Sequence, residues 1–548
     1  MRLFLIWVCL FFLHKVNAQL PQGVKLPDWK QAGTIVPDRY YNQLEFNGDA
    51  TGKIDNTPLL QQLLDTLKKP TVVVFGIGNF LFKSKIVLPS GCVLRGRGAQ
   101  HTIFQFSQNS VHASSIEIRG TESSTFYPLI TNALQDSAMI EIEIKNALKV
   151  KKGQILRLYQ NDSSLINDSW ALKSTGQLVE VAEVLDNKIV ILQKLRQDFL
   201  QSKGAGFKIV TPAIYNGIEH LKIIRYDYTN TGSGSSNILL RYAWKTIIKS
   251  IESENCNFAH LEANYSGKLL VEDSYFHDAF NFGGNGRAYG IMLQYSTGDA
   301  LIQNNIFKTL RHAMILQAGA NGNVFAFNYA TQSKKEFFPG FYGPGEDIAL
   351  HGNYPFANLF EGNEVNIASV DNSHGKNGPT NTFFRNRISN GYLLVTNPLS
   401  NGQVFVGNHL INATNSFAAN AHWITDNSWQ GISNLTTVSM FFEEKPEYLT
   451  TINPLPGAPA FATNPAIPAI GRLLANKPIG KAANELIWNG KTWNSCLQPG
   501  STTSFCNGYI YSGNRVLLSN EVKLTRLELK NGAAAEMPIN GKLLLTGQ

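Results

Sequence analysis

Two histidine-glycine pairs stand at the same distance from an asparagine. In "HGNYPFAN" His351 precedes Asn358 by seven residues, and in "HGKNGPTN" His374 precedes Asn381 by seven. A neutral imidazole can act as a general base, and two imidazoles that lie close together disfavour each other's protonation. The repeated spacing therefore predicts a pair of candidate bases, provided that the fold brings both histidines into one cleft.

Other interpretations of the two histidines stay open. A His-Gly pair at a turn can simply hydrogen-bond to the backbone. A metal site would need a third ligand at a suitable distance, such as Asp347 or Asp371. The spacing alone does not separate these alternatives, and we assign no metal ligand from the sequence.

Positive charge lies near the histidines in the sequence. Arg311 stands in "KTLRHAMIL", and Lys376 follows His374 by two residues. A uronic acid loses its C5 proton more easily when a cation neutralises its carboxylate, and β-elimination then cleaves the glycan. We predict His351, His374, Arg311 and Lys376 as catalytic residues, with a histidine as the base and Arg311 or Lys376 as the neutralising cation.

Aromatic and polar residues in the same stretches are candidates for substrate binding. Aromatic rings that line a groove can stack on sugar faces, although many such rings only hold loops against the fold. The predicted substrate-binding residues are His312, Asp347, Asp371, Tyr342 and Tyr354.

A competing chemistry would hydrolyse a glycoside with two carboxylates. Asp347 precedes Asn358 by eleven residues, and Asp371 precedes Asn381 by ten, so the two aspartates could lie on adjacent coils of a repeating fold. A third alternative is a non-catalytic glycan-binding or adhesin protein, because a fold does not dictate a function.

A repeating fold is indicated by an apolar residue followed three positions later by a polar one. The pairs are Ile247/Ser250, Leu270/Asp273, Ile302/Asn305, Phe325/Asn328, Phe360/Asn363, Phe383/Asn386 and Phe405/Asn408. Most steps are 22 or 23 residues, about one coil of a parallel β-helix whose coils stack roughly 4.8 Å apart. The two longer steps predict loops inserted within 276–299 and 331–352, and the asparagines are expected at turns.

The N-terminal region carries a family resemblance. A "GDATGKIDNT" turn is followed by a short amphipathic helix, then by "VVVFGIGNFLF", "IVLPSGCVLRGRG" and "TIFQF". This order resembles the N-terminal cap of secreted right-handed parallel β-helix proteins of the pectate-lyase superfamily, with Asn56 where the family usually has a second aspartate. The resemblance implies the fold and chemistry on glycans, but this motif contributes no catalytic residue.

The predicted fold class is all-β: a right-handed single-stranded parallel β-helix with a short N-terminal capping helix and an inserted small β subdomain. The predicted divisions are a signal peptide (1–18), cap and first coils (19–119), the inserted subdomain (120–212), coils with binding loops (213–440), and a Pro/Ala-rich linker with C-terminal strands (441–548). The insertion is expected because alternating strands there lack the asparagine periodicity.

The first residues predict export. A basic start, an apolar run from Leu3 to Leu13 and Ala18 before Gln19 are typical of a cleaved secretory signal, which indicates a secreted or periplasmic protein. Cleavage lowers the formal net charge from +8 to +6. Cys496 and Cys506 could then form a disulfide, while Cys92 and Cys256 are expected as buried thiols.

The partner predicted by this interpretation is a polysaccharide substrate. The positive charge is spread along the chain rather than gathered in a nucleic-acid footprint, and no later apolar stretch is long enough to span a membrane. No phosphate-binding, nucleophile-elbow or zinc-protease motif occurs. The cofactor is unknown: the sequence leaves Ca²⁺ open and requires none. It leaves the oligomeric state and the identity of the glycan undetermined.

Overall fold

The computed structural model describes residues 24–34, 42–108, 113–228, 234–284, 286–418, 423–425, 438–449 and 467–479. It also describes short strands near the C-terminus: β43 (Leu486–Ile487), β44 (Tyr509–Ile510), β45 (Arg515–Leu517), β46 (Glu521–Leu524), β47 (Glu528–Leu529), β48 (Ala534–Glu536) and β49 (Lys542–Leu545). The predicted signal peptide, most of the Pro/Ala-rich segment and the Cys496/Cys506 pair lie outside the described residues.

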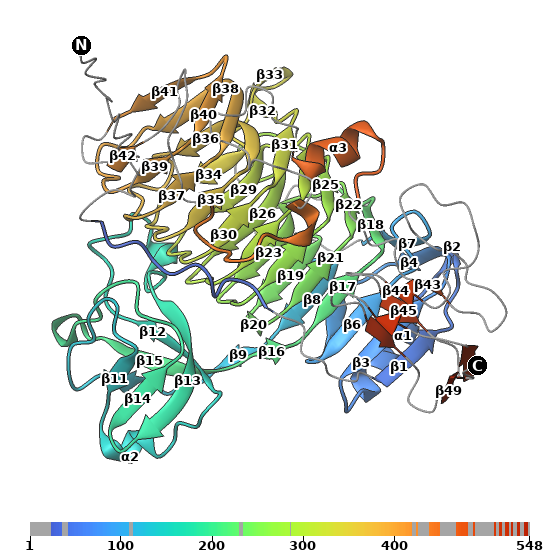
Figure 1. Ribbon diagram of the computed structural model, residues 1–548, viewed down its shortest axis with the longest axis horizontal. Helices are drawn as coiled ribbons and strands as arrows, with labels where there is room; N and C mark the ends of the chain where they lie inside the picture. Colours follow the sequence, from blue (N-terminus) through green and yellow to red (C-terminus); the bar gives the residue numbers. More distant parts are fainter. Residues whose placement is uncertain are drawn as a thin grey trace, which may run out of the picture.

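The chain winds into a parallel β-helix, as predicted (Figure 1). One sheet has 12 strands, stacked in this order: β1 (Asn42–Phe46), β3 (Thr71–Phe75), β6 (Cys92–Arg95), β17 (Gly217–Glu219), β21 (Ile247–Lys249), β24 (Leu270–Glu272), β27 (Leu301–Gln303), β30 (Val324–Ala326), β35 (Leu359–Glu361), β37 (Thr382–Phe384), β39 (Val404–Val406) and β42 (Trp423–Thr425). We call it the first sheet.

The other strands of the coils form two stacks. The second stack contains β2 (Thr51–Asp55), β4 (Gly78–Phe82), β7 (Thr102–Phe106), β18 (Lys222–Arg225), β22 (Glu252–Glu254), β25 (Tyr275–His277), β28 (Ile306–Lys308), β31 (Tyr329–Thr331), β36 (Glu364–Val370), β38 (Arg387–Val395) and β40 (His409–Ile411). The third contains β5 (Ile86–Leu88), β8 (Ile116–Arg119), β19 (Ile238–Arg241), β23 (Ala259–Asn264), β26 (Tyr289–Gln294), β29 (His312–Leu316), β34 (Ile348–Leu350) and β41 (Thr414–Phe417). The long strands β36 and β38 join the two stacks, because each pairs with strands of both.

The interior of the coils is a continuous apolar core. Phe325, Phe360, Phe383 and Phe405 stack along the axis with ring centroids 5.0–5.4 Å apart. These residues are fully buried, so each coil buries its aromatic ring against the next one.

The predicted asparagine ladder is present at a turn. Asn328 donates to Asn363, which donates to Asn386, which donates to Asn408, each over 3.0 Å. The predicted alignment is one residue out of register at its first two positions, Ile247 and Leu270. Leu270 lies opposite Leu301 rather than Ile302.

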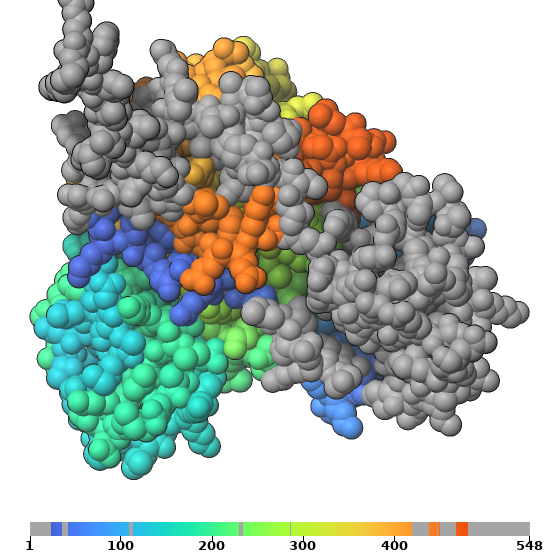
Figure 2. Space-filling view, viewed as in Figure 1, coloured from blue at the N-terminus to red at the C-terminus, as the bar shows by residue number. Residues whose placement is uncertain are grey.

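An antiparallel subdomain is inserted between β8 and the corner strand β16 (Ala213–Ile214), which pairs with β20 (Ala243–Trp244) on the next coil. It contains β9 (Thr121–Glu122), β10 (Tyr127–Pro128), β11 (Met139–Glu141), β12 (Ile155–Tyr159), β13 (Gln177–Leu185), β14 (Lys188–Ile191), β15 (Gly206–Thr211), α2 (Ile144–Ala147) and the short 3₁₀ helices at Ser169–Ala171 and Gln201–Lys203. It has its own apolar core, and Figure 2 shows it as a cyan and green lobe beside the coils.

Other elements cap or cover the coils. The capping helix α1 (Thr57–Thr66) buries Leu60 and Leu64 against the first coils. Segments 24–34 and 438–449 and helix α3 (Pro468–Leu474) contribute apolar side chains to a cluster over the first sheet. The second of the two predicted loops forms an antiparallel hairpin, β32 (Lys335–Phe338) and β33 (Phe341–Gly343).

The described part of the chain contains Cys92 and Cys256, which are buried free thiols, as predicted. Of the helices in the described residues, none has the length and apolar character needed to cross a membrane.

Candidate active site

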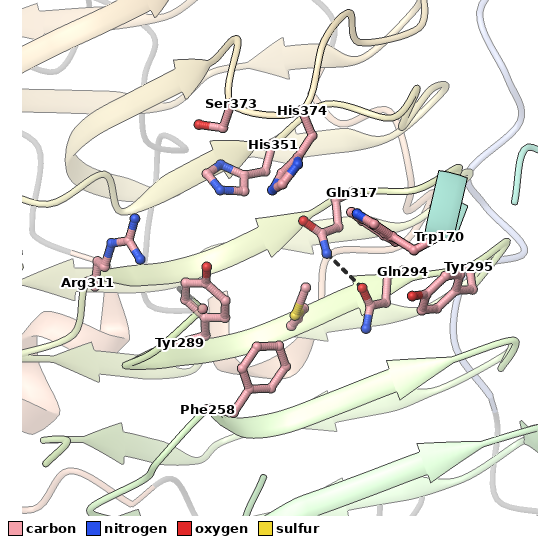
Figure 3. A pocket seen from close by; sticks show the side chains of 12 residues that line it. Trp170, Phe258, Tyr289, Gln294, Tyr295, Arg311, Gln317, His351, Ser373 and His374 are labelled. Carbon is pink, nitrogen blue, oxygen red and sulfur yellow. Dashed lines mark hydrogen bonds between the residues drawn. The ribbon is translucent and has the colours of Figure 1, made fainter. Parts of the chain in front are cut away.

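A cleft of about 540 Å³ opens on the third stack of strands (Figure 3). Its lining is mostly aromatic, amide and imidazole, with one guanidinium. The residues are Trp170, Phe258, Gly286, Tyr289, Met292, Gln294, Tyr295, Arg311, Gln317, His351, Ser373 and His374. Both candidate histidines are among them, and no aspartate or glutamate is.

His351 is held by an aspartate on the next coil. His351 follows β34 and Asp371 follows β36, and the pairing of Leu350 with Val370 puts the two residues opposite each other. Nδ1 of His351 lies 2.5 Å from Oδ2 of Asp371. Burial favours the neutral acid, but the hydrogen bond and the charge of His351 outweigh it and hold the pKa of Asp371 below its ordinary value. Asp371 is therefore an ionised acceptor, and Nδ1 of His351 donates to it.

His374 is held by an aspartate from the inserted subdomain. Its Nδ1 lies 2.9 Å from Oδ2 of Asp168, which directly precedes the 3₁₀ helix Ser169–Ala171. Asn353 donates to the same carboxylate oxygen over 2.9 Å. Although partial burial opposes ionisation, these two hydrogen bonds keep the pKa of Asp168 below its ordinary value. The inserted subdomain thus contributes a residue that holds one of the two histidines of the cleft.

The two imidazoles share the cleft. Their ring centroids are 5.3 Å apart with an angle of 71° between the planes, and Figure 3 shows both rings entering from the same wall. Neither Nε2 atom has a hydrogen-bond partner among the described residues. Each histidine therefore presents Nε2 as a free proton acceptor or donor.

The register predicted for the pair is wrong. His351 lies beside Asp371, and His374 is three residues further along, at the point where its carbonyl accepts from the amide of Asn353. The coil that contains His374 has extra residues after β36, which shift this histidine from the expected register. The rings still meet because the backbone of His374 lies beside Gly352, the residue after His351.

His312 lies beneath the cleft rather than in its lining. Its ring is 5.3 Å from the rings of both His351 and Tyr289, and only 1% of its side chain is exposed. Burial, together with the nearby His351 and Arg311, lowers its pKa well below the ordinary value. His312 is therefore a neutral ring that supports the cleft floor, and the structure places it out of reach of a substrate.

Arg311 is the cation of the cleft. It donates from a terminal nitrogen to the carbonyl of Gly283 over 3.1 Å, and its guanidinium lies 6.0 Å from the centre of the Tyr289 ring. Its Nε is buried without a partner, and no carboxylate among the described residues forms an ion pair with it. Figure 3 shows the Tyr289 hydroxyl directed toward the space between Arg311 and His351. This end of the cleft is suited to an anionic group.

Three further predicted residues, besides His312 and the two aspartates, lie outside the cleft lining. Lys376 donates to the carbonyl of Ser164 over 3.0 Å, so its ammonium tethers the inserted subdomain. Tyr354 packs against Phe356, and Tyr342 is exposed on the β32–β33 hairpin. None of these three side chains reaches the cleft.

Asp347 and Asp371 do not form the carboxylate pair that the hydrolase alternative requires. Asp347 lies opposite Ile367, and Asp371 follows Val370, so the two are four strand positions apart, roughly 13 Å. Asp347 is buried and accepts from the amides of Asn366 and Ile367, while its burial raises its pKa to about 6. Asp347 therefore belongs to the interior of the coil.

Several lining residues escaped prediction. Trp170 stands edge-on to the rings of His374 and Tyr295 at 5.5 and 5.9 Å, but it belongs to the inserted subdomain and carries no repeat signal. Gln294 and Gln317 are adjacent on successive coils, with a 2.7 Å hydrogen bond between their amides. They are 23 residues apart, so the coil period could have identified them.

One group of described residues has the spacing of metal ligands. Ligand atoms of Glu252, Glu254 and His277 lie within 4.8 Å of one another on the second stack. The ammonium of Lys222 already contacts both glutamates, at 2.7 and 2.6 Å. The group is thus an internally balanced charge cluster, and it does not line the cleft.

Comparisons with known proteins agree with the fold. Residues 40–257 match the family "Rhamnogalacturonase A/epimerase, pectate lyase-like". This part of the chain therefore resembles pectate-lyase-like proteins, and the coils continue beyond it as the same parallel β-helix. The match ends just before Phe258, so it includes Asp168 and Trp170 but neither histidine of the cleft. No curated protein matches the sequence.

Solved structures with a similar fold include phage tailspikes and an adhesin. The tailspike protein gp49 of Pseudomonas phage LKA1 is 16% identical, with 89% of this chain and 70% of that chain covered and a TM-score of 0.49. The gp54 tailspike of Acinetobacter baumannii bacteriophage AP22, solved with a capsular saccharide, is 11% identical, with coverages of 68% and 63% and a TM-score of 0.39. The surface adhesin PfbA of Streptococcus pneumoniae is 10% identical, with coverages of 69% and 93% and a TM-score of 0.29. All three TM-scores lie below 0.5, and these likenesses identify neither substrate nor reaction for this chain.

Proposed function

We propose that the protein is a polysaccharide lyase that cleaves a uronate-containing glycan by β-elimination in this cleft. The observation that carries the proposal is the set of groups in the lining: two imidazoles with free Nε2 atoms and one cation without a carboxylate partner. Elimination needs a base, a proton donor and a positive charge, and these three are present together.

Arg311 has the role of binding the substrate carboxylate. Removal of the C5 proton places negative charge on that carboxylate in the transition state, and a fixed cation in a partly buried cleft stabilises such charge. Because no described carboxylate neutralises Arg311, its charge is available to the substrate. The histidines then exchange protons with C5 and with the leaving oxygen.

Asp371 and Asp168 act on the histidines rather than on the sugar. Each accepts from Nδ1 of one imidazole, which fixes the tautomer that leaves Nε2 toward the cleft. A carboxylate in this position also stabilises the imidazolium that forms when the ring takes up a proton.

The lining disfavours the hydrolase alternative. A glycoside hydrolase with paired carboxylates needs two acids flanking the scissile bond. No aspartate or glutamate lines the cleft in the described part of the chain. The export signal expected at the N-terminus leads us to propose that the lyase acts outside the cytoplasm.

A panel of acidic and neutral glycans tests the proposal. A lyase gives products whose new C4–C5 double bond is conjugated to the carboxylate and absorbs in the ultraviolet. A hydrolase gives new reducing ends without that absorbance, and an adhesin binds without product. Ultraviolet-absorbing products from an acidic glycan support the proposal; reducing ends alone, or binding without turnover, would overturn it.

A further inference from the structure

We infer that the cleft performs a syn elimination, so that its substrate contains 4-linked glucuronate or mannuronate rather than galacturonate, guluronate or iduronate. The inference rests on the proposed lyase function. It comes from the placement of the two imidazoles relative to each other.

The stereochemistry of a uronate decides which arrangement of acid and base can act on it. In 4-linked glucuronate and mannuronate, the C5 proton and the glycosidic oxygen on C4 lie on the same face of the sugar ring. In galacturonate, guluronate and iduronate they lie on opposite faces. An acid and a base on one side of the sugar therefore serve the first class, and groups on both sides serve the second.

His351 and His374 meet only one face of a sugar. Their ring centroids are 5.3 Å apart. A pyranose placed between them would need a van der Waals contact of about 3.5 Å on each side, or roughly 7 Å in total. The space between the rings is too small for this, so a bound sugar lies against the pair and presents the same face to both.

The wall from which the rings come supports this placement. His351 follows β34 and His374 lies in the turn after β36, and both rings point into the cleft from that side (Figure 3). On the floor, Gln294 and Gln317 carry amides that do not titrate. Tyr289 and Tyr295 are the phenols of the lining, and burial raises the pKa of both hydroxyls, that of Tyr295 to about 12.

Two neighbouring imidazoles suit a shared proton. Like-charge repulsion disfavours two imidazolium ions at this distance, while Asp371 and Asp168 each stabilise one. With one ring neutral and the other protonated, the pair supplies one base and one acid on the same side of the substrate.

The step balances with these two groups alone. Nε2 of the neutral imidazole takes the C5 proton, and the electron pair of the C5–H bond forms the C4=C5 double bond. The C4–O4 bond breaks, and O4 takes the proton of the imidazolium. One fragment ends in an unsaturated uronate and the other in a hydroxyl group, while the two histidines have exchanged protonation states.

Pairs of glycans that differ only at C5 test the inference. Polymannuronate and polyguluronate form one pair, and chondroitin and dermatan form another, with glucuronate and iduronate respectively. We expect ultraviolet-absorbing products from polymannuronate or chondroitin at a rate at least about a hundredfold above that of the C5 epimer, because a base on the wrong face loses general base catalysis. Faster turnover of polyguluronate, dermatan or polygalacturonate would overturn the syn assignment and leave the lyase proposal standing. No absorbance from any of these polymers would overturn both.

Variants separate the histidine pair from a donor on the floor. On the polymer that is cleaved, we expect His374→Ala to lower turnover more than Tyr289→Phe does. The reverse order would place the acid on the floor, opposite the base, and would overturn the inference. Urea unfolding of each variant shows whether the fold is retained.

Discussion

Nδ1 of His351 lies 2.5 Å from Oδ2 of Asp371, its neighbour on the next coil, and the two are joined by strand register rather than by a loop. Asp371 also accepts from the amide of Ser373 over 2.9 Å, so both carboxylate oxygens have partners. The second dyad, His374 with Asp168, is formed differently, because its carboxylate comes from the inserted subdomain. The site therefore joins a rigid part made by the coils to a part that depends on how the subdomain docks.

Neutralising Asp371 should impair His351 as a base while leaving its imidazole in place. We expect Asp371→Asn to lower kcat by about a hundredfold or more with little change in KM, because the amide no longer stabilises the imidazolium. Steady-state kinetics measure both parameters.

Comparison with Asp168→Asn and a distant control makes this result specific. Asp168 is more exposed than Asp371, 27% against 14% of the side chain, so its replacement should cost less. Asp186→Asn, in the exposed turn between β13 and β14, should leave kinetics unchanged. An unchanged kcat in Asp371→Asn would contradict the role given to this carboxylate.

Arg311 and Lys376 should differ sharply, although the sequence favoured both as the neutralising cation. Arg311 lines the cleft without a carboxylate partner among the described residues, whereas the ammonium of Lys376 is bonded to the carbonyl of Ser164. We expect Arg311→Ala to lower kcat/KM by about 10²-fold or more, with partial recovery in Arg311→Lys. Lys376→Ala should change it by less than about threefold, the scale of one exposed contact. Equal losses in the two alanine variants would contradict the assignment.

Trp170 should act in binding rather than in chemistry. It stands edge-on to His374 at the end of the cleft nearest the subdomain, where its indole can contact a sugar unit. We expect Trp170→Ala to raise KM about tenfold on a polymeric substrate, the usual cost of truncating a large aromatic contact, with a smaller change in kcat. Trp170→Phe keeps an aromatic ring and should retain most of the affinity. A loss confined to kcat would instead show that Trp170 positions His374.

The sequence predicted the coils better than the cleft, for a physical reason. Every coil must bury an apolar side chain and close a turn in the same way. Phe325, Phe360 and their asparagines therefore recur at a fixed spacing that is visible in the sequence. Gln294 and Gln317 share that spacing, so the same reasoning could have placed them side by side. His374 departs from it because the extra residues before it lie in a turn, where no pairing fixes the register.

Contacts between distant parts of the chain were beyond prediction. Asp168 and His374 are 206 residues apart, and the hydrogen bond between them depends on the docking of the inserted subdomain. No periodic pattern links a subdomain to one particular coil, so Asp168 and Trp170 could not be assigned to the cleft. For the same reason Lys376, which binds the subdomain, resembled a cleft residue in sequence.

Glu361 should make the fold less stable as the pH rises through weakly acidic values. It is fully buried at the end of β35, and one carboxylate oxygen accepts from the amide of Met440 over 2.9 Å. Burial raises its pKa from 4.5 to about 7, against smaller lowering effects from Ser439, Met440 and Arg385. Between these pH values the folded protein keeps a proton that the unfolded chain releases, so the free energy of unfolding falls as the pH increases.

Glu361→Gln should remove this dependence, because glutamine does not titrate. The free energy of unfolding of the variant minus that of the wild type should rise by up to about 3 kcal/mol between pH 4.5 and pH 8, as the shift of the pKa requires. Other buried acids such as Asp347 titrate in both proteins and cancel from the difference. Urea unfolding at a series of pH values measures it, and Glu45→Gln, at an exposed position, should keep the wild-type slope. A pH-independent difference between Glu361→Gln and the wild type would mean that Glu361 is ionised in the folded protein throughout this range, with its charge balanced by the nearby Arg385.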